Sequence, residues 1–213
     1  ETSSVTFTFS EAPQGFALGD IASAQGSFSG LTATANPLVW TATFTPNTNI
    51  EDTATVTVTA GSYTDVAGNL GTAGSDTTLV DTQGPAAPTL ALSNDSGISD
   101  SDKITNDGTL TAAGTETGAL VEYSTNGTDW SSSFTPAQGS NTVYVRQTDS
   151  AGNVSPASPA LTFTYDTTAP SVTVDIAATA LKAGETSSVT FTFNEAPQGF
   201  ALGDIASAQG SFR

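Results

Sequence analysis

The chain has 213 residues, of which 21 are acidic and four are basic, giving a formal net charge of −17 at pH 7. This balance excludes nucleic-acid binding, which needs Lys and Arg to displace counterions, and it disfavours contact with an anionic membrane surface. Cys, Met and His are absent, which excludes disulfides, thiol or imidazole metal sites and catalysis by a histidine base. No apolar run reaches the roughly 18 residues of a membrane span.

Alternation of apolar and polar residues with a period of two predicts strands along the chain, and no segment keeps a helical period. In chain order, strands are expected at Ser4–Phe9, Val39–Thr45, Thr53–Thr59, Thr142–Val145 and Leu161–Tyr165. Gly, Asn, Asp and Pro cluster between them, as is typical of turns. Short strands of this kind, in modules of about 85–100 residues, predict an all-β fold of tandem immunoglobulin-like β-sandwich modules in an elongated array.

The chain contains a long repeat and a shorter one inside it. Residues 185–212 repeat residues 1–28 with a single difference, Asn194 in place of Ser10. A DxAGN motif occurs at residues 65–69 and again at 149–153, and a DTxxP motif at 81–85 and again at 166–170. Each long period therefore holds two related modules, each ending in a DxAGN loop, a strand and a DTxxP joint.

We accordingly divide the chain into module A (residues 1–82), module B (83–167) and the start of the next copy of module A (168–213). By the repeat, the opening strand of module A should resemble Ser171–Ile176, and residues 1–82 hold no such segment. We expect the sequence to be a piece of a longer array. The alternative is head-to-tail self-association, in which Ser171–Ile176 of one chain fills the gap in its neighbour.

The parity of the strands predicts where acidic loops meet, because successive strands of a sandwich run alternately between its two poles. One group should converge at the joint before module A: Glu11, Asp65, Asn69 and an Asp166-type residue, with Asp166 meeting Glu195, the copy of Glu11, at the intact joint. The first loop of module B, residues 93–108, should face that same joint with four acidic residues: Asp95, Asp100, Asp102 and Asp107. The other joint should gather Asp81, Glu116, Asp149 and Asn153, with Asp52 as a further candidate.

These groups suit calcium, which takes about 6–8 oxygen ligands from carboxylates, carbonyls and water. Converging carboxylates repel one another and raise their own pKa values, and a bound dication would remove that penalty. We therefore predict that Ca²⁺ binds at the joints between modules. The alternative is that Asp, Asn and Gly are present only because they favour turns.

The segments VTFTFxEAPQGFALGDI, TDxAGN and DTTAP, with SDSDKITNDGTLT and VEYSTNGTDW in module B, carry a resemblance that covers essentially the whole chain. They resemble the bacterial Ig-like repeats of giant surface adhesins, which include biofilm-associated proteins and the extender regions of RTX-type adhesins. The resemblance implies an extracellular stalk on the bacterial cell surface, rigidified by calcium, that spaces an adhesive domain from the cell and supports adhesion or biofilm formation. Its partners would be neighbouring repeats of the same chain, and it would not be an enzyme.

Two other functions are compatible with the sequence. One is a module that binds a glycan or a surface, which predicts an exposed aromatic patch near Trp130. The threonines at alternate positions of Thr53–Thr59 could form a flat binding face, although a solvated strand face is the simpler interpretation. Trp40 lies among alternating apolar residues and is expected in the core. The other function is an accessory region of a secreted enzyme.

Overall fold

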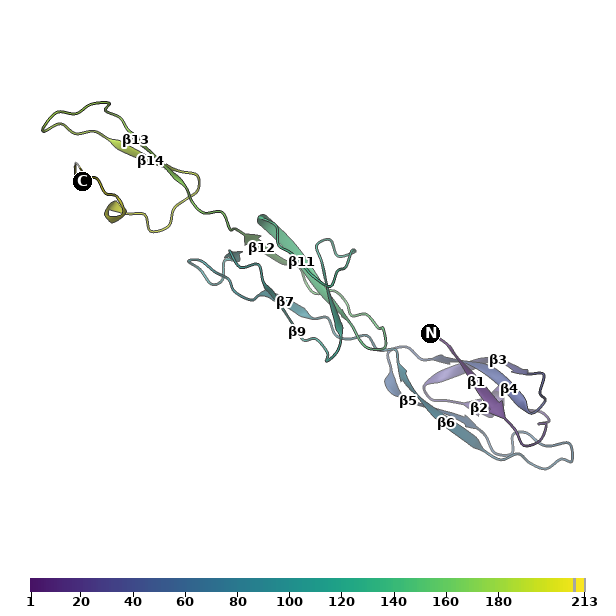
Figure 1. Ribbon diagram of the computed structural model, residues 1–213. Coiled ribbons are helices and arrows are strands. Elements are labelled where there is room, and N and C mark those ends of the chain that lie inside the picture. Colours follow the sequence, from purple (N-terminus) through teal and green to yellow (C-terminus); the bar gives the residue numbers. More distant parts are fainter. Residues whose placement is uncertain (209, 213) are drawn as a thin grey trace.

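The computed structural model describes residues 1–208 and 210–212 and shows an elongated molecule with three β-rich parts in a row (Figure 1). The first part holds residues 1–82 and the second residues 83–167. The third begins near residue 168. The segment predicted as the start of the next module A runs to Arg213; Gln209 and Arg213 lie outside the described residues. Among the described residues, no helix is long and apolar enough to cross a membrane.

Module A is a sandwich of two three-stranded sheets, with the strand orders β1-β4-β3 and β2-β5-β6. All pairs in both sheets are antiparallel. The six strands are β1 (Ser3–Thr8), β2 (Ile21–Ala22), β3 (Gly26–Ala33), β4 (Val39–Pro46), β5 (Glu51–Val58) and β6 (Gly74–Asp81), with a 3₁₀ helix, η1 (Leu18–Asp20), before β2. In an immunoglobulin sandwich these are the B-E-D and C-F-G strands, and a strand A normally lies beside strand B, which here is β1.

The core of module A forms where the inner faces of the two sheets meet. On β5 the residues Ala54, Val56 and Val58 are buried, and the threonines between them face outward. Phe7 of β1 packs edge-on against Phe16, with ring centroids 5.6 Å apart. The period-two pattern read from the sequence thus has a direct cause, because alternate side chains of a strand point to opposite faces.

Module B has a two-stranded sheet, β7-β9, and a four-stranded sheet, β10-β11-β12-β8. Its strands are β7 (Thr89–Leu92), β8 (Ile104–Thr105), β9 (Leu110–Ala113), β10 (Leu120–Ser124), β11 (Gly139–Thr148) and β12 (Leu161–Tyr165). Val143, Leu161 and Phe163 form its buried cluster. The short strand β8 pairs in parallel with β12, and it is the only parallel pair among the described strands.

The third part is a hairpin of β13 (Val172–Ile176) and β14 (Val189–Phe193), followed by a 3₁₀ helix, η2 (Leu202–Asp204). None of the described residues from 166 onward is fully buried. The hairpin therefore carries the pairing of a sandwich edge without a second sheet to cover its apolar face.

All five strands expected from the alternating pattern are present, with ends displaced by at most three residues. The pattern missed β2, β3 and β6 of module A and β7–β10 of module B. For β3 there is a physical reason. Gly30 has a φ of +66°, and the register of β3 against β4 shifts between Ser29 and Thr32. This β-bulge interrupts the alternation that a sequence reading depends on.

Candidate metal-binding joints

The two DxAGN loops fold in the same way. In each, the Asn backbone N–H donates to Asp Oδ1, at 2.9 Å for Asn69 to Asp65 and 2.8 Å for Asn153 to Asp149. The Asn Nδ2 donates to Asp Oδ2, at 2.6 Å and 2.9 Å respectively. The Gly of each loop has a φ near +90°, +89° for Gly68 and +93° for the equivalent Gly in module B, a conformation that favours glycine. Both carboxylate oxygens thus close the loop.

These hydrogen bonds lower the pKa of both aspartates. For Asp65, the bonds from the Asn69 side chain and backbone are the main cause, and they outweigh desolvation. For Asp149, desolvation is the largest single influence and raises the pKa, but the bonds from Asn153 and the loop backbone together exceed it, so that the net shift is downward. Both groups are therefore negatively charged at neutral pH, as calcium ligands must be.

The joint between modules A and B centres on Asn153. Its Nδ2 donates to Asp81 Oδ1 at 3.1 Å and to the Asp81 backbone carbonyl at 3.3 Å, in addition to Asp149. Asp81 is the last residue of β6, whereas Asp149 directly follows β11. One amide group is therefore shared by carboxylates from two modules, at the narrow point where the modules meet (Figure 1).

Two further acidic residues lie near this joint. Glu51 is directly opposite Asp81 in the β5–β6 ladder, a placement of like charges that destabilises a strand pair. Glu116, predicted as part of the group, has an exposed side chain, and its backbone N–H donates to Gln147 Oε1 at 2.8 Å. Asp52 instead accepts a hydrogen bond from Gln25 Nε2, at 3.3 Å. The contacts thus unite Asp81 with the two motif residues of module B.

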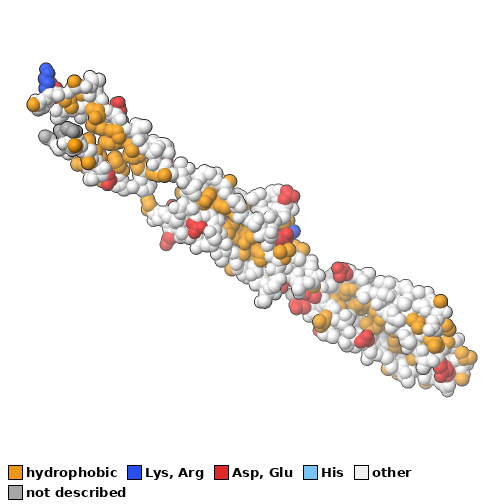
Figure 2. All heavy atoms as spheres, viewed as in Figure 1, with side chains coloured by type: hydrophobic (Ala, Val, Ile, Leu, Met, Phe, Trp, Pro, Cys, Tyr) orange, Lys and Arg blue, Asp and Glu red, His pale blue; other side chains and the backbone are white. Residues whose placement is uncertain are grey.

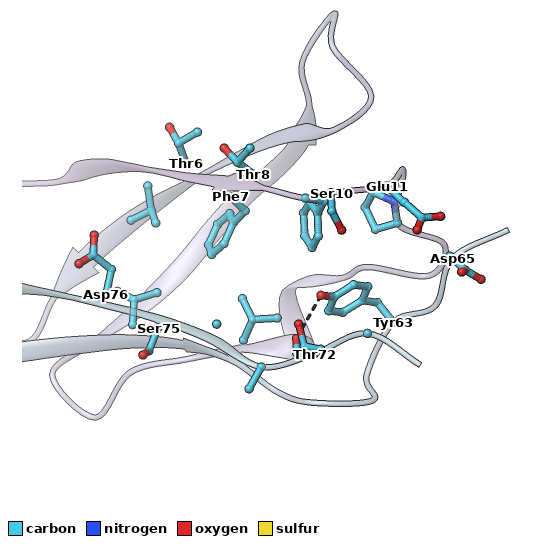
Figure 3. A pocket seen from close by; sticks show the side chains of 18 of the residues that line it. Thr6, Phe7, Thr8, Ser10, Glu11, Tyr63, Asp65, Thr72, Ser75 and Asp76 are labelled. Carbon is cyan, nitrogen blue, oxygen red and sulfur yellow. Dashed lines mark hydrogen bonds between the residues drawn. The ribbon is translucent and has the colours of Figure 1, made fainter. Parts of the chain in front are cut away.

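Glu11, Asp65 and Asn69 lie at the opposite pole of module A. Glu11 follows the end of β1 and the Asp65 loop precedes β6, so both belong to the pole away from module B. All three line one cleft, and Figure 3 shows Glu11 and Asp65 at the same end of it. No hydrogen bond joins Glu11 to Asp65 among the described side chains.

At the joint after module B, Asp166 Oδ1 accepts hydrogen bonds from Gln138 Nε2 at 2.5 Å and from the Thr168 backbone at 3.0 Å. The Thr168 and Gln138 bonds lower the pKa of Asp166. Glu195, the residue predicted to meet Asp166, follows the end of β14 in the third part of the chain. Glu195 Oε1 is buried and lacks a hydrogen-bond partner.

The acidic loop of residues 93–108 lies beside the same joint, because the Asp166 backbone donates to the Thr105 carbonyl at 2.9 Å. Asp95 Oδ2 accepts from the Lys103 backbone at 2.8 Å, and its Oδ1 is buried without a partner. The other three acidic residues differ in their contacts: Asp102 accepts from the Ile104 backbone, Asp107 accepts from the Thr109 backbone and has a lowered pKa caused by Thr109, and Asp100 is exposed.

The A–B joint presents a partial oxygen set for Ca²⁺. Asp81 Oδ1, the Asp81 carbonyl and Asp149 Oδ2 all lie within 3.3 Å of Asn153 Nδ2. A half-turn of the Asn153 amide would present its oxygen at this point, giving four oxygens that water could extend to the 6–8 of a calcium site. The described residues contain no group of three or more Asp or Glu placed to hold a metal ion.

Gln147 is a joint residue that the sequence reading missed. Its side chain is fully buried; Nε2 donates to the Ala86 carbonyl at 2.8 Å and the Gly114 carbonyl at 3.1 Å, while Oε1 accepts from Glu116. It therefore ties β11 to the linker that enters module B. The sequence does contain a signal for this role. Gln147 continues the row of inward-facing residues formed by Val143 and Val145, and a buried amide at such a position needs hydrogen-bond partners.

The two tryptophans lie in different surroundings. Trp40 packs edge-on against Phe16, with ring centroids 5.7 Å apart, as expected for a core residue. Trp130 is half-buried under the Arg146 guanidinium, 4.4 Å from its ring centroid, and Arg146 is also paired with Glu122 at 2.9 Å. Trp130 is therefore covered by a fixed cation.

Module A has sheets in the B-E-D and C-F-G orders, and module B packs a two-stranded sheet against a four-stranded one. Two such modules in a row define a protein of tandem immunoglobulin-like sandwiches. A family model described as a bacterial Ig-like domain matches residues 1–82 and 166–213, and a second model with the same description matches residues 83–167. The chain belongs to the bacterial Ig-like domain family. Comparison with curated proteins gives no match.

Proposed function

We propose that this chain is a spacer: a structural repeat in the stalk of a secreted bacterial surface adhesin or filament, where it supports cell adhesion or biofilm formation. The chain would lie outside the cell, contact neighbouring repeats and carry no catalytic activity. The observation that supports this proposal is the Asn153 bridge, through which Asp81 of module A and Asp149 of module B share one amide group. A spacer must transmit orientation from one module to the next, and this contact couples two modules directly.

The linker supports the same function because it is short and packed. Only seven residues, 82–88, separate β6 from β7. Pro85 and Pro88 restrict its backbone, and Gln147 holds Ala86 by a hydrogen bond of 2.8 Å. A Cβ on Gly84 would lie 3.0 Å from the Val154 carbonyl, so this part of the linker runs close against module B. A linker of this kind limits bending at the joint.

We propose that calcium stiffens the joint further. The ion would be held by the Asp81 and Asp149 carboxylates, the Asp81 carbonyl and the Asn153 amide oxygen, with water completing the shell. It would neutralise the repulsion between Asp81 and the opposing Glu51. Because the ligands come from both modules, binding would favour the aligned arrangement over a bent one.

The test is thermal unfolding and small-angle X-ray scattering in millimolar Ca²⁺ and then in excess chelator, with Mg²⁺ as the comparison cation. We expect Ca²⁺ to raise the Tm and to give a rod-like scattering profile, because a ligand that binds only the folded state stabilises it by about 2.7 kcal/mol at 100 times its Kd. In chelator the profile should become that of a flexible chain.

Asp81→Asn should abolish the calcium-dependent part of both signals. The matched control is Asp129→Asn, because Asp129 also accepts a hydrogen bond from an Asn side chain, Asn126, at 2.6 Å but is not part of the joint. It should keep the full calcium response. Identical Tm and scattering in Ca²⁺ and chelator would rule out calcium at the joints and leave a stalk of ordinary β-modules.

A further inference from the structure

Module B has an open pocket between its two sheets, near the pole where the chain leaves the module. Its volume is about 550 Å³, which lies within the roughly 300–1,000 Å³ of ligand pockets. Three aromatic side chains line it from separate segments: Tyr123 from β10, Phe134 from the loop before β11, and Tyr165 from the end of β12. All three are half-buried and pack on one side against the buried cluster of module B. The pocket is thus an aromatic recess that the core does not fill.

The aromatic rings of the pocket leave room for a guest. Phe134 packs edge-on against Phe163 of the core, with ring centroids 6.3 Å apart, but none of the three pocket rings packs against another within the described residues. The loop at the rim runs close to the rings, because a Cβ on Gly108 would overlap the Pro136 ring and lie 3.3 Å from Tyr165 Cδ2. Glycine at this position therefore lets the backbone lie against the aromatic lining.

The polar part of the lining favours a cation. Asp107 Oδ1 accepts a hydrogen bond from the Thr109 N–H at 3.0 Å, and the bonds from Thr109 hold the pKa of Asp107 below its usual value. This carboxylate is therefore negatively charged at neutral pH. The other polar side chains of the lining include Asn106 and Ser133, and no Lys or Arg of the described chain is among the lining residues. An anionic guest would be repelled, and a cation would be attracted.

The charge of the whole molecule acts in the same direction. The chain has 21 acidic and four basic residues, and Figure 2 shows acidic side chains along the entire length of the molecule. Such a field raises the local concentration of cations. A cation with N–H groups holds its water strongly, whereas a quaternary ammonium carries methyl groups instead and sheds water readily. Aromatic rings attract such a group through the negative faces of their π systems.

We propose that this pocket of module B binds a quaternary ammonium group of the kind that choline carries. The methyl groups would lie against the three rings, and Asp107 would compensate the positive charge. Asn106 and Ser133 are exposed at the rim and supply hydrogen-bond partners for the hydroxyl of choline. Phosphocholine, the form in which a lipid headgroup presents this cation, should bind more weakly, because its phosphate would meet no basic side chain in the lining. This function is separate from spacing and does not rest on it.

The experiment is a titration of the isotope-labelled 213-residue chain with choline chloride, followed through its backbone amide NMR shifts. Excess chelator is present, so that divalent cations do not compete for Asp107. We expect saturable shifts confined to the residues around the pocket, with half-saturation in the millimolar range. Dimethylbutanol, the neutral isostere in which a carbon atom replaces the nitrogen, should bind at least about tenfold more weakly. Ethanolamine, which keeps the charge on an N–H group, should also bind more weakly than choline.

Two substitutions test the aromatic lining. Tyr165→Leu removes one ring and should weaken choline binding by about 5- to 30-fold. Tyr165→Phe keeps the ring and should bind choline like the wild type. The matched control is Tyr144→Leu, because Tyr144 is also half-buried but lies on the outward-facing side of β11 and is not part of the pocket. It should leave choline binding unchanged.

The charge is tested by Asp107→Asn, which should weaken choline binding several-fold. Asp129→Asn is its control, because Asp129 is exposed and lies outside the pocket. The proposal would be overturned by the absence of saturable shifts, by equal affinity for choline and for either ethanolamine or dimethylbutanol, or by tighter binding of phosphocholine. Equal losses in the Tyr144 and Tyr165 leucine variants would overturn it as well. None of these results depends on calcium at the joints, so this proposal and the proposed spacer function can fail separately.

Discussion

The Asp and Asn side chains of the DxAGN loops use most of their hydrogen-bonding capacity within a single turn. At Asp65 and Asn69 these bonds close the loop of module A. At Asp149 and Asn153 the same bonds leave Nδ2 able to reach Asp81 as well. One local structure thus serves first as a turn and then, when a neighbouring module lies against it, as a contact between modules.

These loops should make the protein sensitive to acid. The Asp65 and Asp149 carboxyls have pKa values below the usual 3.8, so the folded state binds their protons more weakly than the unfolded state does. Such groups contribute stability above the unfolded pKa, and the contribution is lost as the pH falls through the folded pKa. We expect a nearly constant Tm from neutral pH to about 5 and a steep fall below about 4. Calorimetry at a series of pH values would measure this profile.

Asp65→Asn should lower the Tm at neutral pH, because its amide presents a donor where Asn69 also donates, and it should flatten the fall in acid. The control is Asp100→Asn, since Asp100 is an exposed residue of the acidic loop of module B. It should leave the acid profile unchanged. Profiles of equal steepness for the Asp65 variant and the wild type would show that the loop bonds do not stabilise the anion.

At the scale of elements, the sequence predicts the features that recur in it: strands with alternating apolar residues and loops with a repeated motif. The strands of Thr53–Thr59 and Leu161–Tyr165 follow from alternation, because their threonines face solvent and their apolar residues face the core. The shared loop geometry follows from the motif. The Asn153–Asp81 contact was expected only as a convergence at one joint, since its atoms depend on how two modules pack. That Asp166 meets Glu195 stays a prediction.

The contacts of Gln147 could not be predicted from sequence periodicity, because its three partners come from segments that are distant in sequence. Replacing it with Leu would leave the Ala86 and Gly114 carbonyls and the Glu116 N–H without their partner. We expect Gln147→Leu to lower the free energy of unfolding by at least about 1–3 kcal/mol, the cost of a buried unpaired polar group. Chemical denaturation would measure this loss.

The matched control for that measurement is Gln83→Leu, which makes the same chemical change at an exposed position of the linker. It should change the free energy of unfolding by no more than about 0.5 kcal/mol. Equal losses in the two variants would show that the Gln147 bonds do not stabilise the entry to module B.

At the scale of the whole molecule, length is obtained by stacking small sandwiches rather than by enlarging one core. Each of the first two modules has its own buried cluster, and they are connected by a linker of seven residues. The net charge of −17 makes separate copies of the chain repel one another. Any stiffness beyond a single module must therefore come from the joints. In the described structure, Asn153 is the one side chain that bonds to acidic residues of both modules.

Asn153→Ala should loosen the A–B joint even without calcium. It removes the bonds to Asp81 and Asp149, and each such bond contributes about 0.5–1.5 kcal/mol. Asn69→Ala is the matched control, because it removes the equivalent bond within the loop of module A and no contact between modules. Both variants should lose a similar amount of module stability in chelator, but only Asn153→Ala should broaden the distance distribution from small-angle scattering. Equal scattering from the two would mean that the short linker alone, with Gln147 and its prolines, sets the direction in which module B leaves module A.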